Sequence, residues 1–238
     1  DKTDNNYSFL PINRDTMSEV RLIQDDGTGA ATAELQLCTA HWYGGNAGQS
    51  CANTVESISK LFGGLKIDGY YAIPMDEIPK LNHSVGGVTV TLLEDFQDID
   101  RQMKKGETLA LSDEQAYRYI HDRYGVGDEK NTSRMKRQQQ YMEAFFTKAK
   151  EKAKSDKAYV GQLFREFEQT ATTNLTAKKI SGLTNRLIKG TQKGFFEIKG
   201  TSKIGKALGD GIDHAEFYPD KESIIDVMTK IYGLKKRE

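Results

Sequence analysis

The stretch from Tyr117 to Met142 is rich in basic residues, among them His121, Arg123, Arg134 and Arg137. The pattern predicts a short helix, a Gly-bearing loop and a second helix, so that the four side chains converge on the mouth between the helices. Guanidinium groups beside a helix N-terminus favour a multiply charged anion, above all phosphate or diphosphate. The alternative is an Arg-rich helix face that is only solvated.

Local signals predict how the two helices begin. Ser112 and Gln115 have the spacing of a capping box, which starts the helix that carries His121 and Arg123. The second helix is expected to be capped by Asn131, Thr132 or Ser133. We therefore expect helix ends to set the positions of the arginines.

The rest of the chain alternates between strand and helix patterns. The expected strands are 7–12, 17–24, 67–73, 88–90 and 194–199, and the expected helices are 50–62, 74–84, 163–167, 180–188 and 220–231. Arg14 and Asp15 then fall in the connection between the first two strands, and Glu94 to Leu111 is expected to be a polar surface excursion. This alternation predicts an α/β fold, a three-layer α-β-α sandwich with a central mixed β-sheet.

Composition limits the function classes. The 238 residues are 37% hydrophobic, which suits a single domain, and 34 Lys and Arg balance 34 Asp and Glu. Because the net charge is zero and no basic stripe is present, nucleic-acid binding is disfavoured, and any anion site must be local. No apolar run in these residues is long enough to span a bilayer.

The two cysteines, Cys38 and Cys51, flank a Gly-rich loop. A disulfide closing that loop would contribute about 3 kcal/mol in the chain-entropy model and would indicate an oxidising, extracytoplasmic compartment. The alternative is a pair of buried free thiols. The sequence favours the disulfide, and it shows no cysteine and histidine spacing typical of structural zinc.

Several short motifs occur together along nearly the whole chain: Arg14-Asp15-Thr16, Tyr43-Gly44-Gly45, Val85-Gly86-Gly87-Val88, Arg123, and Arg134 to Gln138. In this combination the chain resembles the LytR-CpsA-Psr family, also called the cell envelope-related transcriptional attenuator domain. Two positions near the arginines depart from the family pattern. His121 stands where the family usually has an arginine, and Asn131 stands where it usually has an aspartate.

The resemblance implies a membrane-anchored enzyme on the extracytoplasmic face of a Gram-positive-type envelope. Such an enzyme transfers a glycopolymer, of teichoic acid or capsule type, from a polyprenyl diphosphate carrier to peptidoglycan. The alternative is a non-catalytic module that binds polyprenyl phosphate or glycopolymer. The family's membrane anchor, N-terminal strand and aspartates are expected upstream of these 238 residues.

The resemblance also implies residue roles. Those expected to be catalytic are Arg14, Asp15 and Arg123, and those expected to bind the diphosphate are His121, Asn131, Arg134, Arg137 and Gln138. Prepositioned guanidiniums would stabilise the charge that develops as the diphosphate bond breaks. A divalent cation, Mg²⁺ or Mn²⁺, is an expected cofactor, held by the upstream aspartates.

Overall fold

The computed structural model describes residues 6–24, 26–29 and 31–233, and the chain separates into two compact units. The first unit comprises Asp1–Ala72, Thr172–Thr176 and Gly190–Glu238. The second comprises Ile73–Ala171 and Ala177–Lys189. That residues 1–238 form one functional domain stays a prediction.

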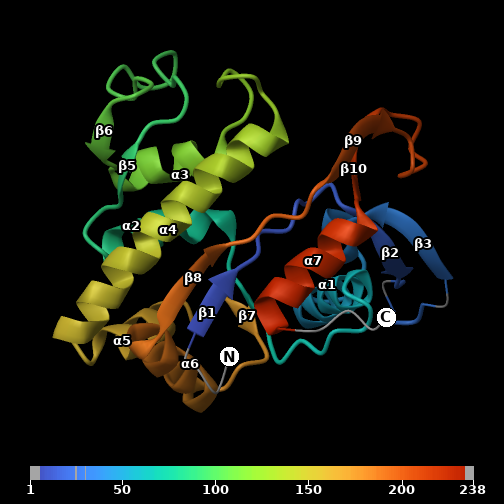
Figure 1. Cartoon of the computed structure of the whole chain (residues 1–238), viewed down its shortest axis with the longest axis horizontal. Coiled ribbons are helices and arrows are strands. Elements are labelled where there is room, and N and C mark those ends of the chain that lie inside the picture. Colours follow the sequence, from blue (N-terminus) through green and yellow to red (C-terminus); the bar gives the residue numbers. More distant parts are fainter. Residues whose placement is uncertain (1–5, 25, 30, 234–238) are drawn as a thin grey trace. The chain divides into compact units, whose positions relative to one another are not determined.

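Short strands and two longer helices build the first unit (Figure 1). Its elements are β1 (Asn6–Phe9), β2 (Met17–Leu22), β3 (Ala31–Gln36), the 3₁₀ helix η1 (Leu37–His41), α1 (Ala47–Leu61), β4 (Tyr71–Ala72), β7 (Thr172–Thr173), β8 (Thr191–Phe195), β9 (Gly200–Gly205), β10 (His214–Pro219) and α7 (Lys221–Tyr232). The strand predicted at 194–199 is wrong in its bounds, because β8 ends and β9 begins on either side of residues 196–199.

Both parallel and antiparallel pairing occur in the first unit. Strands β2 and β3 are antiparallel, as are β9 and β10, while β1 and β8 are parallel. A parallel bridge between Thr16 and Phe217 joins the start of β2 to β10. The predicted mixed α/β class is confirmed, and the strands of the described residues form several two-stranded sheets.

Helix α1 covers this strand region and packs against β2 and η1. Asn46 caps it, since its side chain accepts a hydrogen bond from the Gln49 N–H at 3.0 Å. The buried Asn53 amide donates to the backbone carbonyls of Arg21 and Ala40, both at 2.9 Å. One α1 side chain therefore ties the end of β2 to η1.

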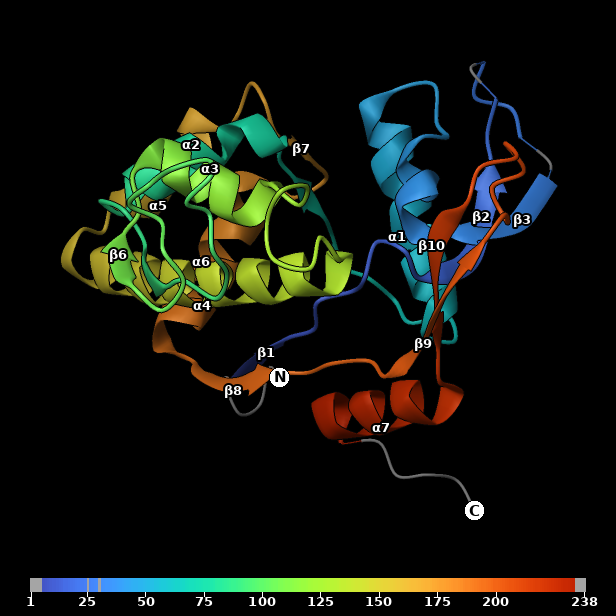
Figure 2. The same cartoon turned by 90° about the horizontal axis from the view of Figure 1, so that it is seen from above.

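Helices form most of the second unit, and Figures 1 and 2 show α3 lying beside α4. Its elements are η2 (Met75–Glu77), α2 (Ile78–Ser84), β5 (Thr89–Thr91), β6 (Thr108–Ala110), α3 (Asp113–His121), α4 (Asn131–Ser155), α5 (Tyr159–Glu166) and α6 (Ala177–Lys189). Residues 122–130, which join α3 to α4, are called the arginine loop here. The capping box is confirmed, with both the Ser112 and Gln115 hydrogen bonds present.

The segment from Glu94 to Leu111 is not the surface excursion that its polarity predicts. Phe96 and Met103 are fully buried in the core of the second unit, and the Phe96 N–H donates to the Met103 carbonyl at 2.9 Å. The Phe96 ring lies 5.6 Å from that of Tyr119 in α3. Two apolar side chains, spaced to meet across a turn, fold the polar segment onto the core.

Candidate functional site

The C-terminal end of α3 leaves backbone carbonyls without intrahelical partners, and side chains of α4 supply donors to them. Arg137 donates to the carbonyls of Tyr119 and Asp122, the latter at 2.6 Å. Gln138 donates to the carbonyl of Ile120 at 2.9 Å. Cationic donors at a helix C-terminus also interact favourably with the helix dipole. The Arg134 to Gln138 run thus caps α3 and fixes the start of the arginine loop.

Arg137 lies at the centre of this arrangement and is only 1% exposed. Its Nε lies 2.7 Å from the Oε2 of Glu94, and its guanidinium lies 5.0 Å from the Phe96 ring centroid. Burial lowers the pKa of Arg137, and the charge of Glu94 acts in the opposite direction. Arg137 was predicted to contact the diphosphate, whereas its donors here bind the protein's own carboxylate and carbonyls.

Arg123 and Arg134 are half-buried at the edge of the same cluster. The Arg123 guanidinium lies 4.5 Å from the centroid of the exposed Tyr124 ring. Arg134 donates to the Oδ1 of Asn131 at 2.7 Å and to the carbonyl of His121 at 3.4 Å. These two arginines, unlike Arg137, carry their positive charge at the protein surface.

His121 extends this cationic edge. Its ring stacks on that of Tyr117 with centroids 4.8 Å apart, and its Nδ1 lies 3.0 Å from the Oδ1 of Asp122. The structure therefore places the Arg134 guanidinium against the backbone of His121, and Arg123 follows two residues later in the arginine loop. These three residues are called the cationic edge below.

The start of α4 differs from the capping prediction. Lys130 is its N-cap residue and makes no side-chain cap. The Asn131 amide oxygen is engaged by Arg134, and the Ser133 hydroxyl donates to Asp128. The Asp128 carboxylate also accepts from the Lys130 N–H at 3.0 Å, and the two hydrogen bonds hold its pKa below the usual range. The Asp128 carboxylate in the arginine loop therefore accepts the hydrogen bonds at the start of α4, where residues 131–133 were predicted to act as caps.

Arg14 and Asp15 belong to the first unit, on a turn whose backbone is fixed from several sides. The Asp15 N–H donates to Asn13 Oδ1 at 2.9 Å, the Asp15 carbonyl accepts from the Phe217 N–H at 2.8 Å, and the Arg14 carbonyl accepts from the Cys38 N–H at 3.0 Å. The Arg14 side chain is 55% exposed, with its Nε 3.7 Å from the Asp15 carboxylate. The turn thus presents one guanidinium to solvent.

The predicted disulfide is not formed in the structure. Cys38 in η1 and Cys51 in α1 are both free thiols, although the two helices pack together. Cys51 is buried, and burial raises the pKa of its thiol. The alternative of two buried free thiols is met only in part, because Cys38 is half-buried.

A divalent cation does not fit the carboxylates present. Within residues 6–24, 26–29 and 31–233, no three His, Cys, Asp or Glu side chains are grouped so that they could hold a metal ion. Asp15, the carboxylate nearest to the predicted chemistry, faces Arg14.

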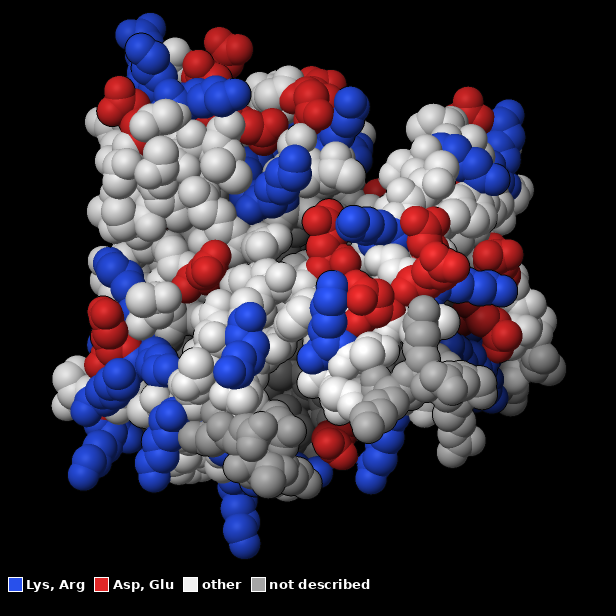
Figure 3. All heavy atoms as spheres, viewed as in Figure 1, with Lys and Arg blue, Asp and Glu red and all other residues white. Residues whose placement is uncertain are grey.

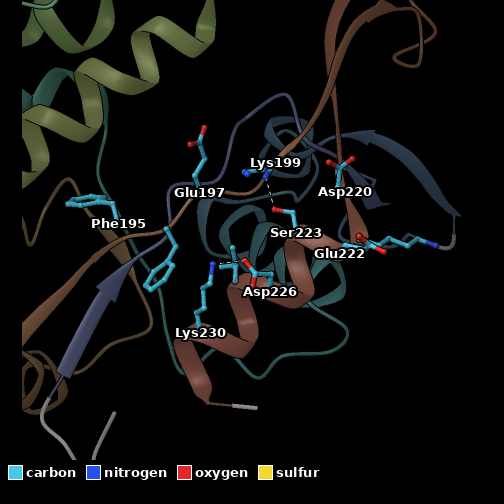
Figure 4. A pocket seen from close by; sticks show the side chains of 11 residues that line it. Phe195, Glu197, Lys199, Asp220, Glu222, Ser223, Asp226 and Lys230 are labelled. Carbon is cyan, nitrogen blue, oxygen red and sulfur yellow. Dashed lines mark hydrogen bonds and ion pairs between the residues drawn. The ribbon is translucent and has the colours of Figure 1, made fainter. Parts of the chain in front are cut away.

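Two hollows differ in charge from a simple anion site. One, of about 660 Å³ beside the arginine loop, is lined by Glu94, Asp95 and Asp128 as well as by Lys105 and Lys136. The other, of about 710 Å³ beside α7, is shown in Figure 4. There Lys230 pairs with Asp226 at 2.7 Å. Since charges of both signs line these hollows, neither favours an anion as the arginine edge does.

Sequence reasoning missed Glu94, the partner of Arg137, whose side chain is 13% exposed. The signal was weak, because a carboxylate that follows a strand is usually solvated. Gly127 could have pointed to it: its φ is +55°, and a Cβ there would collide with the Glu94 carboxylate. The loop glycine and the carboxylate therefore pack as a pair.

The family model of the LytR_cpsA_psr family matches residues 1–231. Similar solved structures include the Lin1025 protein from Listeria innocua, with 22% identity, a TM-score of 0.66, and coverage of 99% of this chain and 90% of that chain. B. subtilis TagV is 20% identical with a TM-score of 0.68, covering 98% of this chain and 85% of that chain.

TagT, also solved from B. subtilis, is a further structural relative. The structure of TagT bound to LIIa-WTA has 17% identity and a TM-score of 0.69, and covers 98% of this chain and 80% of that chain. At these identities the likeness shows a shared fold. No curated protein matches the chain.

Proposed function

Because this chain belongs to the LytR_cpsA_psr family, we propose that it is an extracytoplasmic phosphotransferase that attaches an anionic glycopolymer to peptidoglycan. The donor would be a polyprenyl diphosphate carrying a polymer of teichoic acid or capsule type. Support for this donor class comes from TagT, which shares the fold and is bound to wall teichoic acid ligands in two solved structures.

The observation that carries the proposal is the cationic edge made by His121, Arg123 and Arg134. Two guanidiniums and an imidazole at one surface suit a diphosphate, which presents several anionic oxygens within a short span. The edge is preorganised, because Arg137 and Gln138 hold the end of α3 from which it projects. Preorganised donors stabilise developing charge without reorganising during the reaction.

The proposed reaction transfers the polymer's terminal phosphoryl group to a peptidoglycan hydroxyl and leaves polyprenyl phosphate. Negative charge builds on the bridging oxygen as that bond breaks. Arg123 and Arg134, both in the second unit, would stabilise this charge. In the first unit, taken by itself, Arg14 would offer an exposed guanidinium to an anionic group, and Asp15 would orient it or act as a general base. Arg137 and Gln138 act as positioning residues in this scheme.

Location and accessory factors belong to the same proposal. The described residues contain no helix that is both long and apolar enough to cross a membrane. A membrane anchor is a further part of the proposal. A requirement for Mg²⁺ or Mn²⁺ is an arm of the assay, in which either ion is supplied or chelated.

The test is turnover of a short polyprenyl diphosphate-linked saccharide with peptidoglycan fragments as acceptor. Release of polyprenyl phosphate is the expected result. Arg134→Ala and Arg14→Ala should each lose a charge-assisted contact of about 1.5–3 kcal/mol, which lowers turnover roughly tenfold to a hundredfold. The exposed Arg101 provides a matched control, and Arg101→Ala should retain full turnover.

A non-catalytic binding module is the competing function, and the pairing of Asp15 with Arg14 favours it, because the pairing occupies a candidate base. The same assay separates the two. Lipid binding that depends on Arg134, without release of polyprenyl phosphate under any cation condition, would establish the module. If neither Arg14→Ala nor Arg134→Ala weakens lipid binding, the proposed site is wrong for the enzyme and for the binding module alike.

A further inference from the structure

Helix α6 is exposed to an unusual degree for a helix of 13 residues. None of its residues is buried, and Leu183 is 48% exposed. The helix lies against α4 and α5, at the end of α4 away from the arginine loop (Figure 1). The proposed transfer chemistry makes no use of it.

The charge of α6 has one sign only. The helix carries Lys178, Lys179, Arg186 and Lys189 and no acidic residue, and the chain as a whole has none between Glu168 and Glu197. Figure 3 shows Lys and Arg side chains gathered at the edge of the molecule over α5 and α6. In a chain of zero net charge, this is a strong local excess, and the expectation that the chain has no basic stripe is wrong for this helix.

Spacing places these cations on the outward side of the helix. Lys178, Gly182, Arg186 and Lys189 follow one another at intervals of four, four and three residues, so they form one stripe. A Cβ added at Gly182 would meet no atom within 4 Å, which shows that the stripe faces open space. Leu183 lies between Lys179 and Arg186, four residues after one and three before the other.

The opposite side of α6 faces α4 and α5. Ile180, Thr184 and Ile188 line a groove of about 900 Å³ that α6 shares with α5 and the end of α4. The outward side therefore combines four cations with an apolar side chain that has no protein core to enter. A helix with this composition binds an anionic lipid surface, because phosphates attract its cations while its apolar residue enters the interface.

We propose that α6 docks the second unit onto an anionic membrane surface. Leu183 enters the boundary between headgroups and acyl chains, and Lys178, Lys179, Arg186 and Lys189 contact lipid phosphates. A soluble anionic polymer would satisfy the cations but give no role to the exposed leucine, so lipid is the occupant that fits both features. This contact is independent of the proposed transferase activity.

Helix α7 offers a matched comparison within the same chain. It also exposes an apolar side chain, Ile225, at 46%. Its charges, however, are balanced, with Lys221 and Lys230 against Glu222 and Asp226. Lys230 and Asp226 pair with each other (Figure 4). Since α7 has the apolar residue without the cationic excess, it should not bind lipid.

The test is sedimentation of the chain with vesicles of phosphatidylglycerol and phosphatidylcholine, against vesicles of phosphatidylcholine alone. Binding is expected only to the anionic vesicles. Replacing Lys178 and Lys179 together with Gln should weaken it roughly thirtyfold, since each basic residue near such a surface contributes about 1 kcal/mol. Ile225→Ser in α7 should leave binding unchanged.

Two further variants separate membrane insertion from charge attraction. Leu183→Ser should weaken vesicle binding roughly tenfold, and Gly182→Leu, which adds an apolar side chain on the outward stripe, should strengthen it by a similar factor. Thermal unfolding midpoints close to that of the parent chain verify that the variants fold. A structural role for α6 cannot produce the gain expected from Gly182→Leu.

The opposing outcomes are specific. Absence of binding to anionic vesicles overturns the proposal. A polymer site would be identified instead if binding depends on the lysines but not on residues 182 and 183, and if soluble poly(glycerol phosphate) binds with the same affinity as the vesicles. That result also overturns the proposal. Vesicle binding and polymer binding are both measured without enzymatic turnover, so their results do not depend on the outcome of the transferase assay.

Discussion

The Arg14 turn and the arginine loop use the same side chain in opposite ways. In the turn, backbone hydrogen bonds to Phe217 and Cys38 fix the chain, and the guanidinium of Arg14 is left 55% exposed. In the loop, the guanidinium of Arg137 is 1% exposed and itself fixes the backbone of α3. The backbone around Arg14 is therefore fixed by other residues, whereas the Arg137 side chain itself fixes the backbone at the end of α3.

This difference shows that arginines close together in the sequence need not all bind a ligand. Arg137 and Gln138 satisfy carbonyls that α3 cannot satisfy itself, while Arg123 and Arg134 remain half-buried at the edge. A position that caps a helix should govern stability, and an exposed position should govern ligand affinity. The variants below test this division.

Arg137→Ala is expected to have the largest effect on stability. It leaves the Glu94 carboxylate and two carbonyls without their donor, and breaking a buried ion pair in this way destabilises by about 3–5 kcal/mol. Urea unfolding measures the loss. Arg14→Ala, its exposed counterpart, should change the unfolding free energy by less than about 0.5 kcal/mol.

A double variant sharpens the same test. Glu94→Leu combined with Arg137→Met removes both charges, so part of the stability lost in Arg137→Ala should return. Equal and small effects at positions 137 and 14 would contradict the division between the two regions.

Gly127→Ala is expected to destabilise by about 1–3 kcal/mol, because a side chain at its positive φ is strained and would collide with the Glu94 carboxylate. Gly125→Ala is the matched control. Its φ is also positive, at +74°, but an added Cβ would meet nothing within 4 Å. The difference between the two unfolding free energies measures the Glu94 contact, and equal values would show that only backbone strain matters.

Ser112→Ala removes the N-cap of α3 and should destabilise by about 1 kcal/mol. Gln115→Ala removes the reciprocal hydrogen bond of the same capping box and is expected to have a smaller effect. Circular dichroism melts of the two variants provide the measurement. A larger loss for Gln115→Ala would assign the main role to its side-chain contact with Asp100.

Ser112 also shows which features the sequence can predict. Its capping box depends on two residues three positions apart, and local chemistry of this kind is readable from sequence. The mixed α/β class and the meeting of His121, Arg123 and Arg134 also follow from local patterns. The Arg137 to Glu94 pair joins residues 43 positions apart, and no local pattern encodes such a contact.

Other errors have the same origin. Asn131 and Ser133 have good capping chemistry, but Arg134 and Asp128 compete for their side chains. Phe96 and Met103 lie in a polar segment, yet tertiary packing buries both. The cysteine spacing permits a disulfide, although the structure has two free thiols. For the capping residues and the two apolar side chains, contacts that the predicted pattern does not include decide the outcome.

The smallest predicted effect concerns the pH dependence of the arginine loop at Asp128. Hydrogen bonds from the Ser133 side chain and the Lys130 N–H lower the Asp128 pKa in the folded protein, so folding favours the ionised carboxylate. Its contribution is present above the unfolded pKa of about 3.9 and is lost as the pH falls through the lower folded pKa. The unfolding free energies of the parent and of Asp128→Asn should therefore differ at neutral pH and converge in acid. A gap that stays constant with pH would mean that Asp128 acts through shape alone, and the arginine loop would then depend on the buried Arg137 rather than on charge at its exposed end.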